Sequence, residues 1–247
     1  MSAAHTGRFS RIAAIGFIAA SVALLMVAGA GPAYRAKFVD LGHAFSLLSW
    51  GAWTGLAAFF VALIGGWITR PGTPHRGLAL SLAGIVMAAA AFGVPFAMLQ
   101  SAKRVPPIHD ITTDTANPPR FVAIVPLRKG SPNPFEYEDG NISRQQRAAY
   151  PDIQPATIVE PPDAAFKRAL SAARDLGWQI VAAVPDEGRI EATDTTIWFG
   201  FKDDIVIRIS SADGGSRIDV RSVSRLGKSD LGKNAARIRA YLRRLQQ

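Results

Sequence analysis

The 247-residue sequence contains no cysteine, which excludes disulfide bonds, thiolate catalysis and cysteine-based zinc sites. Histidine is scarce too: the four present are His5, His43, His75 and His109, and all of them precede residue 157. A Ser–His–Asp triad in the C-terminal region would therefore have to borrow His109. The sequence also lacks a phosphate-binding loop of the GxxxxGKS type. We expect no cofactor and consider a non-catalytic protein the better interpretation.

Acidic residues are almost missing from the first 104 residues. This region holds one of the 19 acidic residues, Asp40, and eight of the 28 Lys and Arg residues. The remaining charges nearly balance within residues 105–247, so the high pI of about 10.3 comes mainly from bases that flank apolar stretches. Such bases usually set membrane topology. The basic stretch 201–247 would suit nucleic acid only in the cytoplasm, and we expect no nucleic-acid partner.

Three stretches carry no Lys, Arg, Asp or Glu at all, namely residues 12–33, 44–69 and 77–102. Each exceeds the roughly 20 residues that a helix needs to cross about 30 Å of hydrocarbon. In lipid, the backbone of each stretch must be helical to satisfy its own hydrogen bonds. We therefore predict that residues 1–104 form a three-helix transmembrane anchor with the lipid bilayer as partner. A transport pathway lacks its usual buried ionisable residue.

The orientation of this anchor follows from its first helix. Arg8 and Arg11 precede the first stretch without any acidic neighbour, which favours an N-terminus in the cytoplasm. An alternative is a cleaved signal peptide with Ala28-Gly29-Ala30 as the cleavage site, although the apolar run is long for one. Both readings place the C-terminal part outside the cytoplasm. The expected location is the cell inner membrane, multi-pass, with a periplasmic C-terminal domain.

Residues 105–162 hold eleven of the 16 prolines, a density that blocks regular helix and removes sheet donors. We predict that residues 105–156 form an extended connecting segment. Within it, His109, Asp110 and Asp114 have the chemistry of metal ligands. The competing and preferred interpretation is that the aspartate and threonine side chains of this stretch cap turns in a loop.

Residues 157–247 show regular spacing of apolar residues, and we predict that they form a soluble α+β domain. Apolar residues recur at helical spacing over 166–176, and Gly177 follows as a stop signal. Alternating patterns then predict four antiparallel strands, with a hairpin signal at 212–215. A last helix is expected from Ser229 as N-cap, with Asp230 in its first turn. We expect both helices to pack on the apolar face of the four-stranded sheet. The predicted strands cover residues 178–184, 189–195, 205–209 and 217–224.

Several motifs resemble those of the domain of unknown function 1499 family. The segments that carry the resemblance are 198–204 (WFGFKDD) and 219–234 (DVRSVSRLGKSDLGKN), with 108–114 and 118–121 similar to the family's opening segment. The resemblance covers about residues 105–247 and leaves the apolar region outside. It supports a domain boundary near residue 105 and implies no activity, because the family name assigns none.

The polar residues of the second motif have two interpretations. Alternation along a strand would place Arg217, Asp219, Arg221, Val223 and Arg225 on one face. They form either an Arg–Asp network that fixes strand register and docks the last helix, or a patch for an anionic or polyhydroxylated ligand of the envelope. Arginine forks and a helix N-terminus both suit oxyanions. The candidate ligand-binding residues are Arg208, Arg221, Ser222, Ser224, Arg225, Ser229, Asp230, Asn234 and Arg237.

The alternative function is that of a divalent-cation-dependent hydrolase, in which Asp203, Asp204 and Asp230 gather a hard cation through carboxylate oxygens. Adjacent Asp203 and Asp204 should point to opposite faces of a strand, which makes them a poor acid–base pair. The sequence therefore favours a membrane-tethered binding or structural accessory of the cell envelope.

Overall fold

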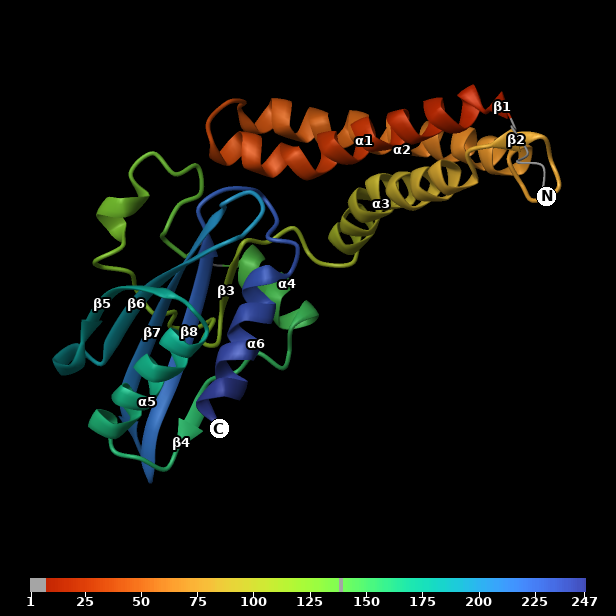
Figure 1. The fold of residues 1–247 in the computed structure, drawn as a ribbon. Coiled ribbons are helices and arrows are strands. Elements are labelled where there is room, and N and C mark those ends of the chain that lie inside the picture. The colour runs from red at the N-terminus through yellow and green to blue at the C-terminus, as the bar shows by residue number, and fades with distance from the viewer. Residues whose placement is uncertain (1–7, 138–139) are drawn as a thin grey trace. The chain divides into compact units, whose positions relative to one another are not determined.

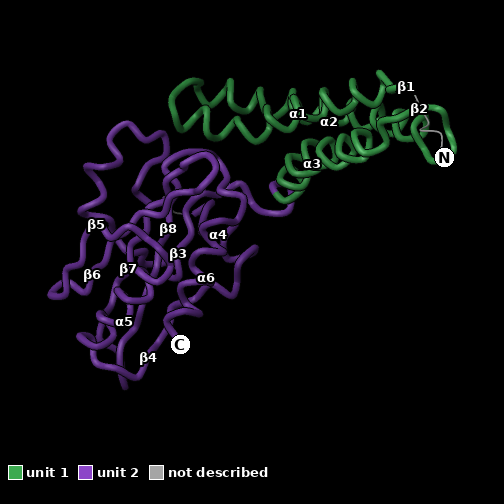
Figure 2. The backbone as a smooth tube through the Cα atoms, in the orientation of Figure 1, with its two compact units in different colours: residues 1–101 green, residues 102–247 purple. Residues whose placement is uncertain are grey.

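A computed structural model describes residues 8–137 and 140–247; residues 1–7, which include His5 and the start of the predicted anchor, lie outside the described residues. The chain forms two compact units, one ending at Ser101 and the other beginning at Ala102 (Figure 2). We call them the helical unit and the sheet unit.

The helical unit consists of three long helices, α1 (Arg11–Arg35), α2 (Leu41–Ile68) and α3 (Leu78–Lys103), with short paired strands β1 (Arg8–Phe9) and β2 (His75–Arg76). All three helices are long and apolar enough to cross a membrane, which makes them candidate spans. They coincide with the predicted stretches 12–33, 44–69 and 77–102 within a few residues.

Packing in the helical unit places small residues inside and large apolar ones outside. A Cβ on Gly55 would lie 2.9 Å from that of Ala91, so helices α2 and α3 approach closely there. Leu25, Trp50 and Val86 are instead about two-thirds exposed. This distribution is the reverse of a water-soluble core and is typical of helices packed in lipid.

The sheet unit is built on six antiparallel strands in the order β3-β8-β7-β6-β5, with β4 also paired to β8 (Figure 1). The prediction of four strands is therefore too low. The four predicted strands are present, and two further ones come from residues 110–158. The strands are β3 (Asp110–Thr112), β4 (Ala156–Ile158), β5 (Gln179–Val184), β6 (Arg189–Thr195), β7 (Lys202–Ala212) and β8 (Gly215–Ser224).

The two extra strands share one edge of β8. Strand β3 pairs with residues 221–223 and β4 with residues 216–218. Each has only three residues, too few to show a period of two, and prolines lie close to both. Residues 105–156 thus contribute a strand, a helix and buried side chains to the sheet unit.

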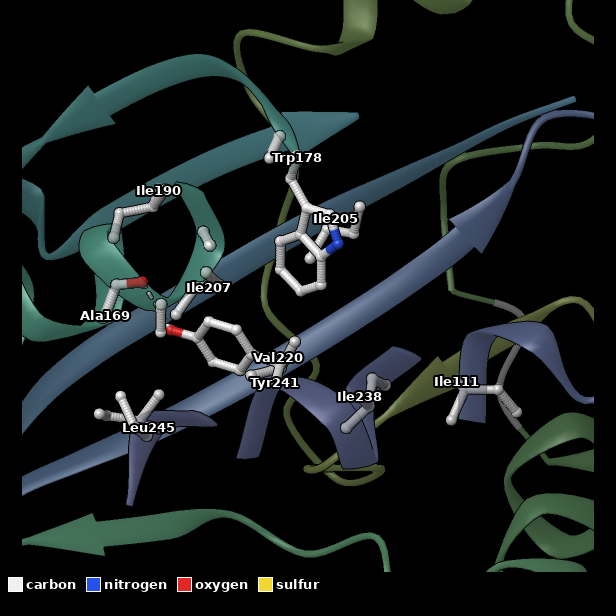
Figure 3. Close-up of a cluster of buried hydrophobic side chains, with 14 of the residues drawn as sticks. Ile111, Ala169, Trp178, Ile190, Ile205, Ile207, Val220, Ile238, Tyr241 and Leu245 are labelled. Carbon is white, nitrogen blue, oxygen red and sulfur yellow. Dashed lines mark hydrogen bonds between the residues drawn. The ribbon is translucent and has the colours of Figure 1, made fainter. Parts of the chain in front are cut away.

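Helices cover one face of this sheet. Helices α5 (Pro162–Asp175) and α6 (Lys233–Leu245) bury their apolar stripes against Ile205, Ile207 and Val220. Tyr241 of α6 stacks on Trp178 with ring centroids 5.2 Å apart, and its hydroxyl donates to the carbonyl of Ala169 at 3.1 Å (Figure 3). Two helices on the apolar face were predicted and are found there.

A third helix of the sheet unit, α4 (Asn141–Ala149), was not predicted. Its Gln146 is buried and bonds both backbone groups of Thr112, accepting from the N–H at 3.0 Å and donating to the carbonyl at 2.6 Å. The side-chain amide thereby takes the place of a neighbouring strand at the outer edge of β3.

The opposite face of the sheet carries a smaller core. Phe121 and Ile124 pack there against Val206 and Val223, and the short 3₁₀ helix η1 (Val125–Arg128) follows them. We call residues 119–137 the covering segment. Each face of the sheet therefore carries a buried cluster, covered by helices on one side and by an irregular segment on the other.

Candidate functional site

Strand β8 divides the polar motif between the two faces of the sheet. Arg221 and Val223 point toward the covering segment, because they contact Phe121 or belong to its cluster. Ser222 and Ser224 point the other way, toward α6, where both bond Asn234. The strict alternation expected from the sequence thus separates the candidate residues into two networks that do not share a cavity.

Arg221 forms a buried ion pair with Asp110 of β3. Its Nε and Nη2 donate to the two carboxylate oxygens at 3.0 and 2.7 Å, and each side chain is only 3% exposed. Arg221 also donates to the carbonyl of Phe135 at 2.8 Å. Burial raises the pKa of Asp110 above its usual value, while the hydrogen bond from Arg221 opposes that rise. The pair joins an edge strand to the sheet and holds the covering segment.

Asp204 is the centre of a second buried cluster on the same face. It accepts from Arg128 at 2.7 Å, from Arg225 through two bonds of 2.8 Å and from the Thr193 hydroxyl at 2.7 Å. Arg128 donates further to the carbonyls of Asn133 and Pro134, at 3.2 Å each. Burial lowers the pKa of Arg128, and the bond to Asp204 counteracts this effect. The cluster fixes the end of the covering segment to the sheet.

Glu191 anchors the beginning of the covering segment. Its carboxylate accepts the backbone N–H groups of Val122, Ala123 and Ile124 at 3.0, 3.0 and 2.8 Å, and it also pairs with Arg189. Neither Glu191 nor Arg128 was among the candidate residues. The alternation of Ile190, Glu191 and Ala192 does place Glu191 on the face away from the helices, but it carries no sign of the backbone N–H groups that Glu191 accepts from.

The outermost charges on this face balance one another. Arg208 pairs with Asp219 at 2.8 Å, and Arg217 bridges Asp219 and Asp114 at 3.0 and 2.9 Å. The hydrogen bond from Arg217 to Asp219 raises the pKa of that arginine. Asp114 was only the less favoured metal-ligand candidate: its Oδ2 pairs with the arginines, and its Oδ1 accepts from the N–H groups of Ala116 and Asn117 at 3.1 and 2.9 Å, as the preferred turn-capping interpretation predicted.

Arg237 organises the network on the helical face. It donates to Asp203 at 2.6 Å, to Asp194 at 2.9 Å and to the side-chain Oδ1 of Asn234 at 2.6 Å. Asn234 in turn accepts from Ser222 at 2.6 Å and donates to the backbone carbonyl of His109 at 2.9 Å. This network docks α6 on the sheet and ties it to the chain that enters β3.

The start of α6 differs from the prediction. The helix begins at Lys233 with Gly232 as N-cap at φ 78°, so Ser229 is not the N-cap; its hydroxyl accepts from the Leu231 N–H in the preceding turn at 3.2 Å. Asp230 supplies the capping oxygens instead, accepting from the N–H groups of Gly232 at 2.8 Å and Asn234 at 2.7 Å. Because glycine tolerates a positive φ, Gly232 allows the chain to turn from Asp230 into the first residue of α6.

We expect Asp230→Asn to destabilise the sheet unit by about 1 kcal/mol at pH 7, through weaker capping of α6. Burial raises the pKa of Asp230 above its usual value of 3.8. As pH falls through the folded-state pKa, folded Asp230 takes up a proton before the unfolded chain does, which favours folding. The stability difference in favour of the wild type should therefore grow on acidification, as measured by urea unfolding at several pH values. A difference that shrinks on acidification contradicts the assigned direction.

The three aspartates of the hydrolase alternative do not meet. Asp203 and Asp204 lie on opposite faces, as alternation predicted, and each is held by arginine, while Asp230 accepts backbone N–H groups. Within residues 8–137 and 140–247, no three His, Asp or Glu side chains gather closely enough to hold a metal ion. Of the candidate ligand-binding residues, Arg208, Arg225 and Ser229 are partly exposed, and the others are buried.

The comparisons with known proteins are limited to one family. The family described as "Protein of unknown function (DUF1499)" matches residues 110–245, which span β3 to the end of α6. No curated protein and no solved structure matches the chain.

Proposed function

Because this chain belongs to the DUF1499 family of proteins of unknown function, we propose a role from its own structure: a membrane-tethered, non-catalytic accessory of the cell envelope. The helical unit is the tether in this proposal, and the sheet unit is displayed in the periplasm. There it serves as a binding or structural module.

The observation that carries the proposal is the internal use of the charged motif. Asp110, Asp203 and Asp204 each hold an arginine that is at least nine-tenths buried in the unit. Both oxygens of Asp110 and of Asp204, and Oδ2 of Asp203, accept hydrogen bonds from buried or half-buried side chains, so these carboxylates serve as internal ion-pair partners and are not displayed to a substrate or a cation. The motif therefore stabilises the fold, and we infer that any partner binds to other residues on the surface of the unit.

We infer the sidedness from the first helix, because Arg8 and Arg11 precede it without an acidic neighbour while the basic residues on the two sides of the membrane are equal in number. An N-terminus in the cytoplasm and three crossings deliver the sheet unit to the outer side of the inner membrane. The unit contains no cysteine, so it has no thiol that an oxidising compartment could convert into a disulfide. Both points agree with a periplasmic display.

Reporter fusions test the tether and its sidedness together. Alkaline phosphatase fused after Gln247 should be active, and a green fluorescent protein at the same point should be dark. A fusion after Gly72, between α2 and α3, serves as the matched control and should give the opposite pair of results. Reversal of the two patterns would overturn the periplasmic placement, and extraction of the full chain by alkaline carbonate would overturn the tether.

A further inference from the structure

One end of the sheet unit is tied to the tether by a very short piece of chain. Six residues, 104–109, separate the end of α3 from β3, and they reach at most about 20 Å when fully extended. They enter beside the end of β8, where the N–H of Ser224 donates to the His109 carbonyl at 3.0 Å. Any bilayer that holds α3 is therefore within reach of this end, which we call the entry end.

Two loops belong to the entry end. The β6–β7 loop, residues 196–201, precedes Asp203, which is paired with Ser224. The β8–α6 loop, residues 225–232, bonds the entering chain through Asp230 N–H and the Ile108 carbonyl at 3.2 Å. Figure 1 shows both loops at the same end of the long strands β7 and β8.

The β6–β7 loop exposes an apolar tip on an aromatic base. Ile197 is 91% exposed, so nearly all of its aliphatic side chain lies in solvent. Behind it, Phe199 contacts Trp198 and Phe201 with ring centroids 5.1 Å apart in each case. Leu127, whose carbonyl accepts from Arg225 at 3.0 Å, adds a second exposed aliphatic side chain at this end.

The charge of the entry end is one-sided. Its fully exposed charged residues are bases from four segments, whereas its aspartates Asp203, Asp204 and Asp230 are buried and the half-buried Asp194 is paired with Arg237. The exposed bases are Lys129, Lys202, Lys228 and Lys233. The opposite end, at the β7–β8 and β5–β6 turns and the start of α5, exposes several acids, of which Glu187 is paired with Arg189. These are Asp163, Asp186, Glu187 and Asp213.

We propose that the entry end is a membrane-contact surface: Ile197 inserts into the interface of the bilayer, and the surrounding lysines bind anionic lipid head groups. An apolar side chain framed by lysines and backed by aromatic rings is the chemistry of interfacial anchors. Each lysine near an anionic surface adds electrostatic attraction. The acidic end then faces away from the lipid. This inference rests on the tether of the proposed function and adds a second, peripheral attachment.

The cysteine-free chain allows a clean test with single labels. Ile197→Cys and Val159→Cys provide a matched pair, because both positions are β-branched and 91% exposed while lying at opposite ends of the sheet. The full-length variants are labelled with an environment-sensitive fluorophore in nanodiscs containing phosphatidylglycerol and brominated lipids. Insertion to a depth of about 5–10 Å should quench the label at 197 at least about twofold more than the label at 159.

Lysine neutralisation tests the anionic component. With Lys202→Gln and Lys228→Gln together, quenching at 197 should fall to the level found in neutral phosphatidylcholine discs. Lys167→Gln, in α5, should leave it unchanged. Unchanged quenching in the double variant would contradict the proposed binding of anionic lipid head groups by the lysines.

Other results separate this proposal from the one it rests on. Equal quenching at 197 and 159 overturns it, and so does a blue shift at 197 without lipid quenching, which would indicate contact with protein. In both cases the chain would still resist carbonate extraction and the tether would stand. A chain that fails to enter nanodiscs removes both proposals.

Discussion

Replacing Asp204 with alanine is expected to lower the free energy of unfolding of the sheet unit by about 3–5 kcal/mol, because it leaves buried arginine without its counter-ion. Arg128 has an almost fully buried side chain, and Arg225 is 15% exposed in its side chain. Thr193 also loses the acceptor of its hydroxyl. Removal of this one carboxylate thus affects three side chains and the anchored end of the covering segment.

Pulse proteolysis of the full-length chain in a urea series measures this loss. Asp152→Ala is the matched control, since Asp152 also accepts two bonds from an arginine, Arg239, at 2.6 and 2.7 Å. That pair is largely exposed, so its removal should cost no more than about 1 kcal/mol. Asp204→Asn keeps an acceptor for Thr193 and should fall between the two. Similar losses for Asp204→Ala and Asp152→Ala would contradict a structural role for the cluster.

Arg221→Ala is expected to destabilise the sheet unit by a similar amount, about 3–5 kcal/mol, because Asp110 stays buried without its partner. Burial already raises the pKa of Asp110, and loss of the arginine raises it further. A carboxyl whose folded-state pKa lies above its unfolded value makes the fold less stable as pH rises between the two values. The loss should therefore be larger at pH 8 than at pH 5.

An apolar replacement of the whole pair provides the control for Arg221. In the double variant Asp110→Leu with Arg221→Met, no buried charge is left unpaired, and most of the lost stability should return. Urea unfolding of the single and double variants at both pH values gives the comparison. If Arg221→Ala weakens binding to envelope components and leaves stability unchanged, the binding interpretation of the motif is correct and the structural one is wrong.

The elements that were predicted have strong local signals. Helix α5 and strands β5 to β8 show clear periods of 3.6 and two residues, and Gly177 ends the helical pattern at φ 76°. Strands β3 and β4 have three residues each and exist only because β8 offers a free edge more than 50 residues further along the chain. Helix α4 is rich in polar residues, and its contribution through Gln146 is a pair of hydrogen bonds that no hydrophobic pattern reports.

The candidate site also has a part that the sequence predicts and a part that it does not. The separation of Asp203 from Asp204 follows from strand alternation alone and is confirmed by their partners on opposite faces. The identity of those partners does not follow, because Arg128 reaches Asp204 from 76 residues away and Asp110 reaches Arg221 from 111 residues away. Buried ion pairs between residues so far apart in the sequence depend on the complete fold. The local sequence of the motif therefore does not show whether its charges form a ligand-binding patch or an internal network.

The tandem pairing of β3 and β4 along β8 also constrains the order in which the polypeptide acquires its shape. Residues 110–112 meet residues 221–223, a sequence separation that makes loop closure slow and gives the unit a high contact order. At about 5–20 residues per second, synthesis of the intervening hundred residues takes about 5–20 s. Throughout that interval the proline-rich stretch has left the ribosome with no strand to join. The segments that become β3 and β4 therefore stay unpaired until β8 has been made, and their backbone donors and acceptors are exposed for that time.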